Sequence, residues 1–132
     1  MMPMLQDPHR NALRLLSDRM VSKGFGDYLL SERFSRFCRK NDIYDIWSGL
    51  LTESGDRPDL YGSDMIRHAF FLLLQHIFRV RNAEFPRILA GILANYAEKP
   101  PDPSFLSDIK QDVTRLGYAA NDLDDAFSAL SG

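Results

Sequence analysis

Residues 63–81 read SDMIRHAFFLLLQHIFRVR and form the most apolar helical pattern in the chain. Their apolar side chains cover more than one face of an α-helix; they are Ile66, Ala69, Phe70, Leu73, Leu74, Ile77, Phe78 and Val80. A helix that is apolar on most sides is usually enclosed by its neighbours. We therefore expect a central helix at about 64–81, with Leu73 and Leu74 in the core of the domain.

Amphipathic segments precede and follow this central helix, and helix-ending residues separate them. Apolar spacing predicts further helices at about 7–24, 27–40, 43–51, 86–96, 103–117 and 121–130. Leu30, Phe34, Phe37 and Cys38 are expected to face inward on the second of these. Residues 53–63 predict the longest loop, with Ser63 capping the central helix, and residues 99–103 a stiff proline-rich connector.

No segment shows the alternating pattern of a β-strand, so the sequence predicts an all-α fold. We expect one compact bundle of about six to seven helices, formed by a single domain over residues 1–132, with residues 1–6 as a flexible end. Asp7 with Pro8, and Asp102 with Pro103, each predict a capped helix start. Gly24 and Gly117 are expected to end helices in the left-handed conformation.

Composition indicates a soluble protein of a reducing compartment. The chain has 132 residues, of which 45% are hydrophobic and 26% charged, as in an average globular domain. Cys38 is the only cysteine, so no disulfide can form within the chain, and we expect a cytoplasmic location. The longest apolar stretch, residues 69–78, is too short for a membrane span and contains Gln75 and His76. No membrane association is expected.

Charge is distributed unevenly around a net charge of −2. Residues 1–41 hold eight Lys and Arg against four acids, whereas residues 98–132 hold three against seven. These surfaces can attract each other within one fold, or they can bind a partner protein or a second copy. Asp108 and Asp112 are one helical turn apart, so their mutual repulsion predicts that both face solvent.

A basic ridge follows from the spacing of Arg33, Arg36 and Lys40, with Arg39 adjacent to it. Such a ridge on an outer helical face is a candidate site for nucleic acid or another anion. The interleaved Phe34 and Phe37 are spaced for the core and not for base stacking. The slightly negative net charge also disfavours a dedicated nucleic-acid-binding protein.

A polar ridge lies on the central helix itself. His68, Gln75 and Arg79 share one helical face, and His76 lies beside them. This ridge either lines a pocket or is the one edge of the helix that meets water. Asp64 and His68 are also four residues apart, which is the spacing of a carboxylate–imidazole pair, although no nucleophile accompanies them.

No other motif indicates chemistry. Histidine and cysteine spacings typical of metal sites are missing from the sequence, as is the glycine pattern of phosphate-binding loops. We therefore expect no catalytic residue, metal or cofactor. The sequence favours a non-enzymatic helical module for protein interaction, assembly or regulation. The alternative is a regulator that contacts nucleic acid through the basic ridge, and third comes an enzyme with a site at Asp64, His68 and Arg79.

Overall fold

The computed structural model describes residues 7–96, 102–119 and 121–131, and it is helical throughout its regular parts. The helices are α1 (Asp7–Met20), α2 (Gly26–Leu29), α3 (Glu32–Lys40), α4 (Tyr44–Gly55), α5 (Ser63–Val80), α6 (Phe85–Tyr96), α7 (Pro103–Arg115) and α8 (Asp122–Ser131). A π-helical turn, Val21–Phe25, joins α1 to α2, and a 3₁₀ turn, Asn82–Glu84, precedes α6. These described ranges contain no strand, so the predicted all-α class is confirmed.

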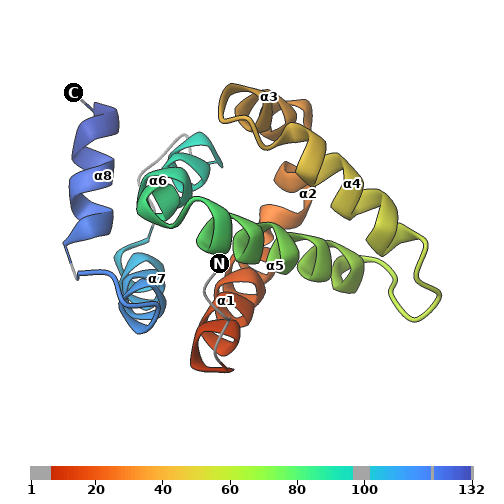
Figure 1. The fold of residues 1–132 in the computed structure, drawn as a ribbon, viewed down its shortest axis with the longest axis horizontal. Coiled ribbons are helices and arrows are strands. Elements are labelled where there is room, and N and C mark those ends of the chain that lie inside the picture. The colour runs from red at the N-terminus through yellow and green to blue at the C-terminus, as the bar shows by residue number, and fades with distance from the viewer. Residues whose placement is uncertain (1–6, 97–101, 120, 132) are drawn as a thin grey trace.

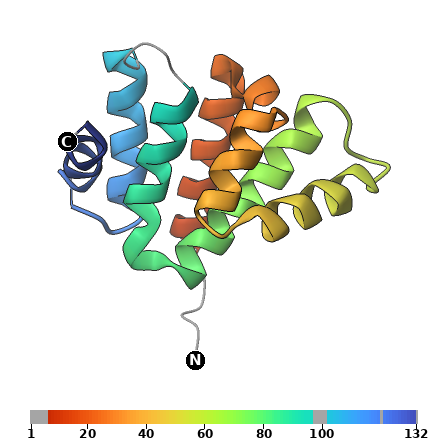
Figure 2. The same cartoon turned by 90° about the horizontal axis from the view of Figure 1, so that it is seen from above.

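The central position of α5 is also confirmed. It packs against α1 on one side and α4 on the other, while α7 packs against α1 and α8 against α6 (Figure 1). Figure 2 shows the hairpin of α4 and α5 extending away from the end of the molecule that carries α7 and α8. Leu73 and Leu74 are both buried, as predicted, with 0% and 1% of their surfaces exposed.

The second predicted helix is wrong in one respect, because the chain divides it into α2 and α3. Ser31 is extended and caps α3, with its hydroxyl oxygen accepting a hydrogen bond from the Phe34 amide at 3.4 Å. This break rotates Leu30 out of the expected apolar stripe, and 52% of its surface is exposed. Phe34 and Cys38 are buried and Phe37 is half-buried, as the spacing within α3 alone predicts.

Three positions predicted to cap or end helices have the expected backbone conformation or hydrogen bond. Gly24 and Gly117 have φ of 105° and 101°, and the Asp102 carboxylate accepts from the Ser104 amide at 3.2 Å. The prediction that Ser63 caps the central helix is wrong, since Gly62, with φ of 58°, is the capping residue. Helix α4 continues to Gly55, so the loop is shorter than expected. Residues 1–6 and most of the proline-rich connector lie outside the described residues.

The expectation that Asp112 faces solvent is wrong. Its side chain is fully buried between α7 and α1, where its carboxylate binds Arg19 at 2.7 Å and Arg115 at 2.8 Å. Arg19 also reaches Asp108 at 3.6 Å. The guanidinium groups of Arg19 and Arg115 compensate the charge of this buried carboxylate, which makes its burial energetically acceptable. At this contact the basic and acidic parts of the chain meet within one molecule.

In the described part of the chain, none of the helices is long and apolar enough to cross a membrane.

Candidate functional site

The polar ridge of the central helix divides between two clefts. Gln75, His76 and Arg79 line a groove between α4 and α5, with a volume of about 470 Å³. His68 lies two turns earlier on α5 and lines a smaller cleft of about 200 Å³ between α5 and α1. The structure therefore brings three of the four predicted residues together and separates the fourth.

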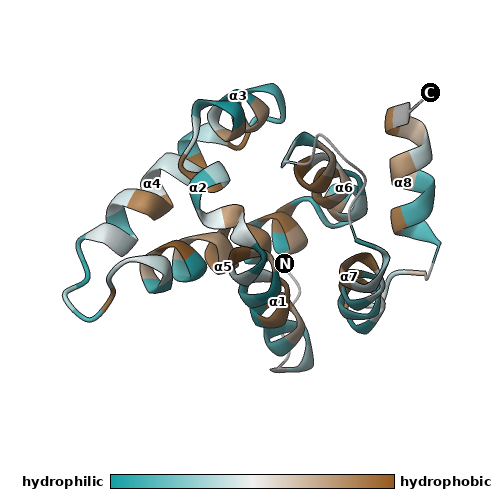
Figure 3. Cartoon of the chain, turned by 180° about the vertical axis from the view of Figure 1, so that it is seen from behind, coloured by the Kyte–Doolittle hydropathy of each residue, from teal (hydrophilic) through white to brown (hydrophobic). Residues whose placement is uncertain are grey.

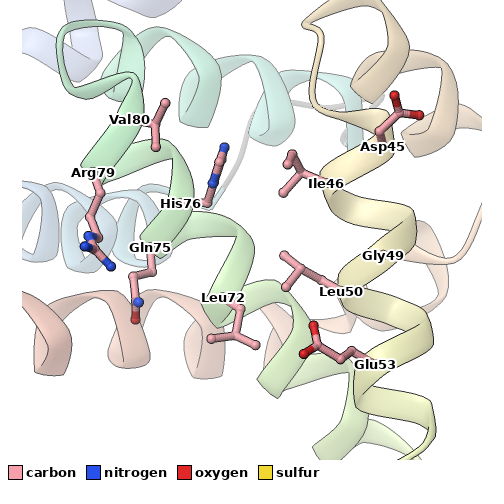
Figure 4. Close-up of a pocket in the computed structure, with 10 residues that line it drawn as sticks. All are labelled: Asp45, Ile46, Gly49, Leu50, Glu53, Leu72, Gln75, His76, Arg79 and Val80. Carbon is pink, nitrogen blue, oxygen red and sulfur yellow. The ribbon is translucent and has the colours of Figure 1, made fainter. Parts of the chain in front are cut away.

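One face of each helix forms the groove, which we call the α4–α5 groove. Its lining residues are Asp45, Ile46, Gly49, Leu50 and Glu53 from α4, and Leu72, Gln75, His76, Arg79 and Val80 from α5 (Figure 4). The spacing of three, four and seven residues on both helices places these positions on facing sides. The groove therefore runs along the surface between α4 and α5.

Apolar side chains line the space between the two helices. Figure 4 shows Ile46 and Leu50 pointing from α4 towards α5. Ile46 and Val80 are 36% and 53% exposed, although both are aliphatic residues of a well-packed domain. Gly49 leaves further room, because a Cβ atom added there would meet no atom within 4 Å. The groove thus presents uncovered apolar surface to solvent.

The charges on the two edges of the groove are opposite. Asp45 and Glu53 lie on the α4 edge, and Arg79 extends beside Gln75 on the α5 edge (Figure 4). Among the described residues, none of these three charged side chains forms an ion pair with another. The Nε atom of Arg79 is buried and has no hydrogen-bond partner there. Such a group favours a ligand that accepts a hydrogen bond.

His76 occupies the middle of the groove, between the two helices (Figure 4). Burial lowers its pKa below the ordinary value of 6.5, and the nearby guanidinium groups of Arg79 and Arg81 lower it further. The imidazole is therefore neutral at physiological pH and offers one donor and one acceptor.

We expect His76→Gln to reduce the loss of stability that acid causes. The unfolded chain takes up a proton on this histidine near pH 6.5, whereas the folded chain does so only at lower pH. The contribution of His76 therefore lowers the free energy of unfolding as pH drops from about 7.5 to about 5.5, and His76→Gln removes this contribution. Urea denaturation at both pH values measures it. The neighbouring Gln75→Leu removes no titrating group and should keep the pH dependence of the parent protein.

The residues of the predicted carboxylate–imidazole pair have other partners. The Asp64 carboxylate binds Arg67 at 3.2 Å, and the Nε2 atom of His68 lies 3.3 Å from the Arg57 guanidinium. Because arginine can only donate, this contact makes Nε2 the acceptor. Arg79 lies eleven residues beyond His68, about 16 Å along the axis of α5. Asp64, His68 and Arg79 are therefore not assembled around one point.

The basic ridge of α3 is exposed, but three of its four cations already contact other groups of the protein. Arg39 binds Glu32 at 3.0 Å and stacks over the Tyr44 ring at 4.4 Å, and Arg33 donates a hydrogen bond to the Asn95 carbonyl oxygen. Arg36 lies 3.9 Å from Glu32. Lys40, at the end of α3, forms no ion pair within the described ranges. Figure 3 shows how hydrophilic the α3 ribbon is beside α6.

Metal-ligating groups do not gather in the described parts of the chain, and the single cysteine is buried. There, no group of three or more His, Cys, Asp and Glu side chains could hold a metal ion. Cys38 is buried, and burial raises the pKa of its thiol to about 12. A buried, protonated thiol contributes to core packing and is not a nucleophile.

The α4 side of the groove was not predicted from the sequence. Asp45, Gly49 and Glu53 repeat every four residues, which is a signal for one helical row. Nothing local, however, indicates that this row faces the row of His76 on α5. Arg87 was not predicted either; it lies on α6 and lines a second groove together with Lys40.

Comparison of the chain with protein-family models, with curated proteins and with solved structures found no match.

Proposed function

We propose that this protein is a non-enzymatic interaction module whose α4–α5 groove binds an amphipathic helix of a partner protein. The observation that carries the proposal is the exposed apolar lining between two edges of opposite charge. A helix laid in such a groove inserts apolar side chains spaced three, four and seven residues apart. Burial of Ile46, Leu50, Leu72 and Val80 would supply the hydrophobic part of the binding free energy.

Charge specifies the orientation of this partner helix. Asp45 and Glu53 favour basic residues on the side of the helix that faces α4, and Arg79 favours a carboxylate on the opposite side. A helix with the two charges exchanged would place like charges together, so the groove discriminates between them.

Two other functions have less support. Catalysis at Asp64, His68 and Arg79 lacks a common centre, because Asp64 binds Arg67, His68 contacts Arg57, and Arg79 lines the other groove. Contact with nucleic acid through Arg33, Arg36, Arg39 and Lys40 remains a prediction from the sequence, and the contacts of Arg33 and Arg39 leave it fewer free cations. A cytoplasmic location, based on the single buried cysteine, is likewise part of the proposal.

Gly49→Leu is expected to weaken partner binding strongly while leaving the protein folded. The new side chain enters the groove from a position with free space, since nothing lies within 4 Å of its Cβ atom. Replacing a glycine inside a helix also stabilises the helix by about 1 kcal/mol. The probe is a displayed library of helical peptides with randomised apolar and charged positions, selected on the unmodified protein. Selected peptides should bind Gly49→Leu at least about tenfold more weakly, the equivalent of about 1.4 kcal/mol.

Gly55→Leu is the matched control. Gly55 ends α4, has open space around it and does not line the groove, so the selected peptides should bind this variant normally. Peptides that bind both variants as well as the parent would place the binding surface elsewhere. A selection that enriches no peptide would contradict the proposed function directly.

A further inference from the structure

A second groove lies between α3 and α6 and is bordered by the end of α8. Its volume is about 510 Å³, within the usual range of small-molecule sites. The lining residues are Phe37, Lys40 and Asn41 at α3, Arg87, Gly91, Ala94 and Asn95 on α6, and Leu130 on α8. Figure 1 shows α6 lying between α3 and α8. We call this site the α3–α6 groove.

Gly91 sets the depth of this groove. A Cβ atom added to Gly91 would lie 2.8 Å from the Phe37 ring, so only glycine allows the ring to approach α6 this closely. The half-buried Phe37, the exposed Ala94 and the exposed Leu130 then give the groove an apolar surface. Apolar surface of this kind suits the body of a small organic ligand.

The ionisable groups that line the groove are both cations, Lys40 and Arg87. Further arginines bind the backbone of the residues at its two ends. Arg33 donates to the carbonyl oxygen of Asn95, and Arg81 donates to that of Asn41. Figure 3 shows the hydrophilic side of α3 near the mainly hydrophobic α6.

Only one carboxylate balances the arginines of α6 and the preceding turn. Glu84 binds Arg81 at 2.5 Å and Arg87 at 3.1 Å, so a single negative charge is shared between two positive charges. Lys40 and Arg33 have no ion pair among the described residues. The groove is therefore distinctly cationic in a chain whose net charge is −2. Such a local excess of positive charge attracts anions.

We propose that the α3–α6 groove binds a small amphiphilic anion, with its carboxylate or phosphate head at Lys40 and Arg87 and its apolar body against Phe37, Ala94 and Leu130. The head group gains charge-assisted hydrogen bonds from an ammonium and a guanidinium group. The apolar body covers surface that is otherwise exposed to water. This site uses two cations that are far apart in the sequence and is independent of the α4–α5 groove.

Titration with small probes, followed by NMR of the ¹⁵N-labelled protein, tests the proposal. Octanoate and octyl phosphate share an apolar chain and distinguish a carboxylate from a phosphate head. We expect at least one of them to shift the backbone amide signals of Phe37, Gly91 and Asn95. Octyltrimethylammonium, with the same chain and a positive charge, and acetate, with the charge but no chain, should bind at least about tenfold more weakly.

Paired variants assign the binding to the groove. Lys40→Gln with Arg87→Gln should weaken binding of the preferred anion about tenfold or more, and Ala94→Leu should weaken it by filling the groove. Arg36→Gln removes a cation from the same helix but outside the groove, so it should have little effect. The proposal is overturned if neither anion shifts these amides, if the cationic probe binds equally well, or if the Lys40 and Arg87 variant binds normally.

Discussion

Leu73→Ala is expected to lower the free energy of unfolding by about 2–5 kcal/mol. Leu73 is completely buried at the middle of α5, which packs against both α1 and α4. Truncation removes the Cγ atom and both Cδ methyl groups from buried contacts and leaves a cavity that the neighbouring helices fill only in part. Urea denaturation monitored by circular dichroism measures the change.

Leu15→Ala is the matched control for this prediction. Leu15 lies on α1 and is 39% exposed, so the same chemical change removes much less buried surface there. Its loss of stability should be well below that of Leu73→Ala. Equal effects of the two substitutions would mean that α5 is not the centre of the core.

The predictable part of the fold rests on local physical chemistry. The apolar pattern at residues 64–81 requires enclosure whatever surrounds it, so the sequence alone identifies α5. Gly24 and the Asp102–Pro103 pair act through their own backbone conformation and hydrogen bonds. Gly24 has the predicted left-handed conformation, although it lies within the π-helical turn after α1, and Pro103 begins α7 as predicted. Such features need no knowledge of the tertiary contacts.

Two other features were not predictable from apolar spacing, one because of a local helix break and one because of a contact between distant residues. The extended Ser31 interrupts an apolar spacing that is otherwise continuous, and Leu30 therefore becomes exposed. Asp112 is buried because Arg19, 93 positions away, reaches it from α1. Repulsion between neighbouring carboxylates predicts exposure, but two guanidinium groups outweigh that repulsion.

The α5 side of the candidate groove could be predicted from the sequence, whereas its α4 side could not. Gln75, His76 and Arg79 form one polar row on α5, which periodicity reveals. His68 shares that row but lies seven residues before Gln75, about 10 Å away along the helix axis. There it lines a cleft with α1 and not with α4. The pairing of α4 with α5 decides which part of the row lines a groove, and this pairing is a tertiary property.

Arg19→Met is expected to destabilise the fold by about 3 kcal/mol at neutral pH, because the buried Asp112 loses its strongest partner. Arg115 keeps its contact at 2.8 Å, but its side chain is half-exposed and compensates the carboxylate only in part. Adding Asp112→Leu to Arg19→Met removes the uncompensated charge and should restore part of the lost stability. Lys23→Met serves as the control, because it breaks a half-exposed ion pair with Asp102 at 3.7 Å and should cost about 0–1 kcal/mol.

The effect of Arg19→Met should also depend on pH. Burial raises the pKa of Asp112, and the Arg19 and Arg115 guanidinium groups oppose this increase. Without Arg19 the pKa of the folded state rises further above that of the unfolded chain. As pH falls, the folded variant is therefore protonated first, which favours folding and reduces the stability difference from the parent protein. Urea denaturation at about pH 7.5 and about pH 5 should show a smaller difference at the lower pH. If the difference is the same at both, a charged Asp112 is not its cause, and lost packing of the Arg19 side chain would account for it instead.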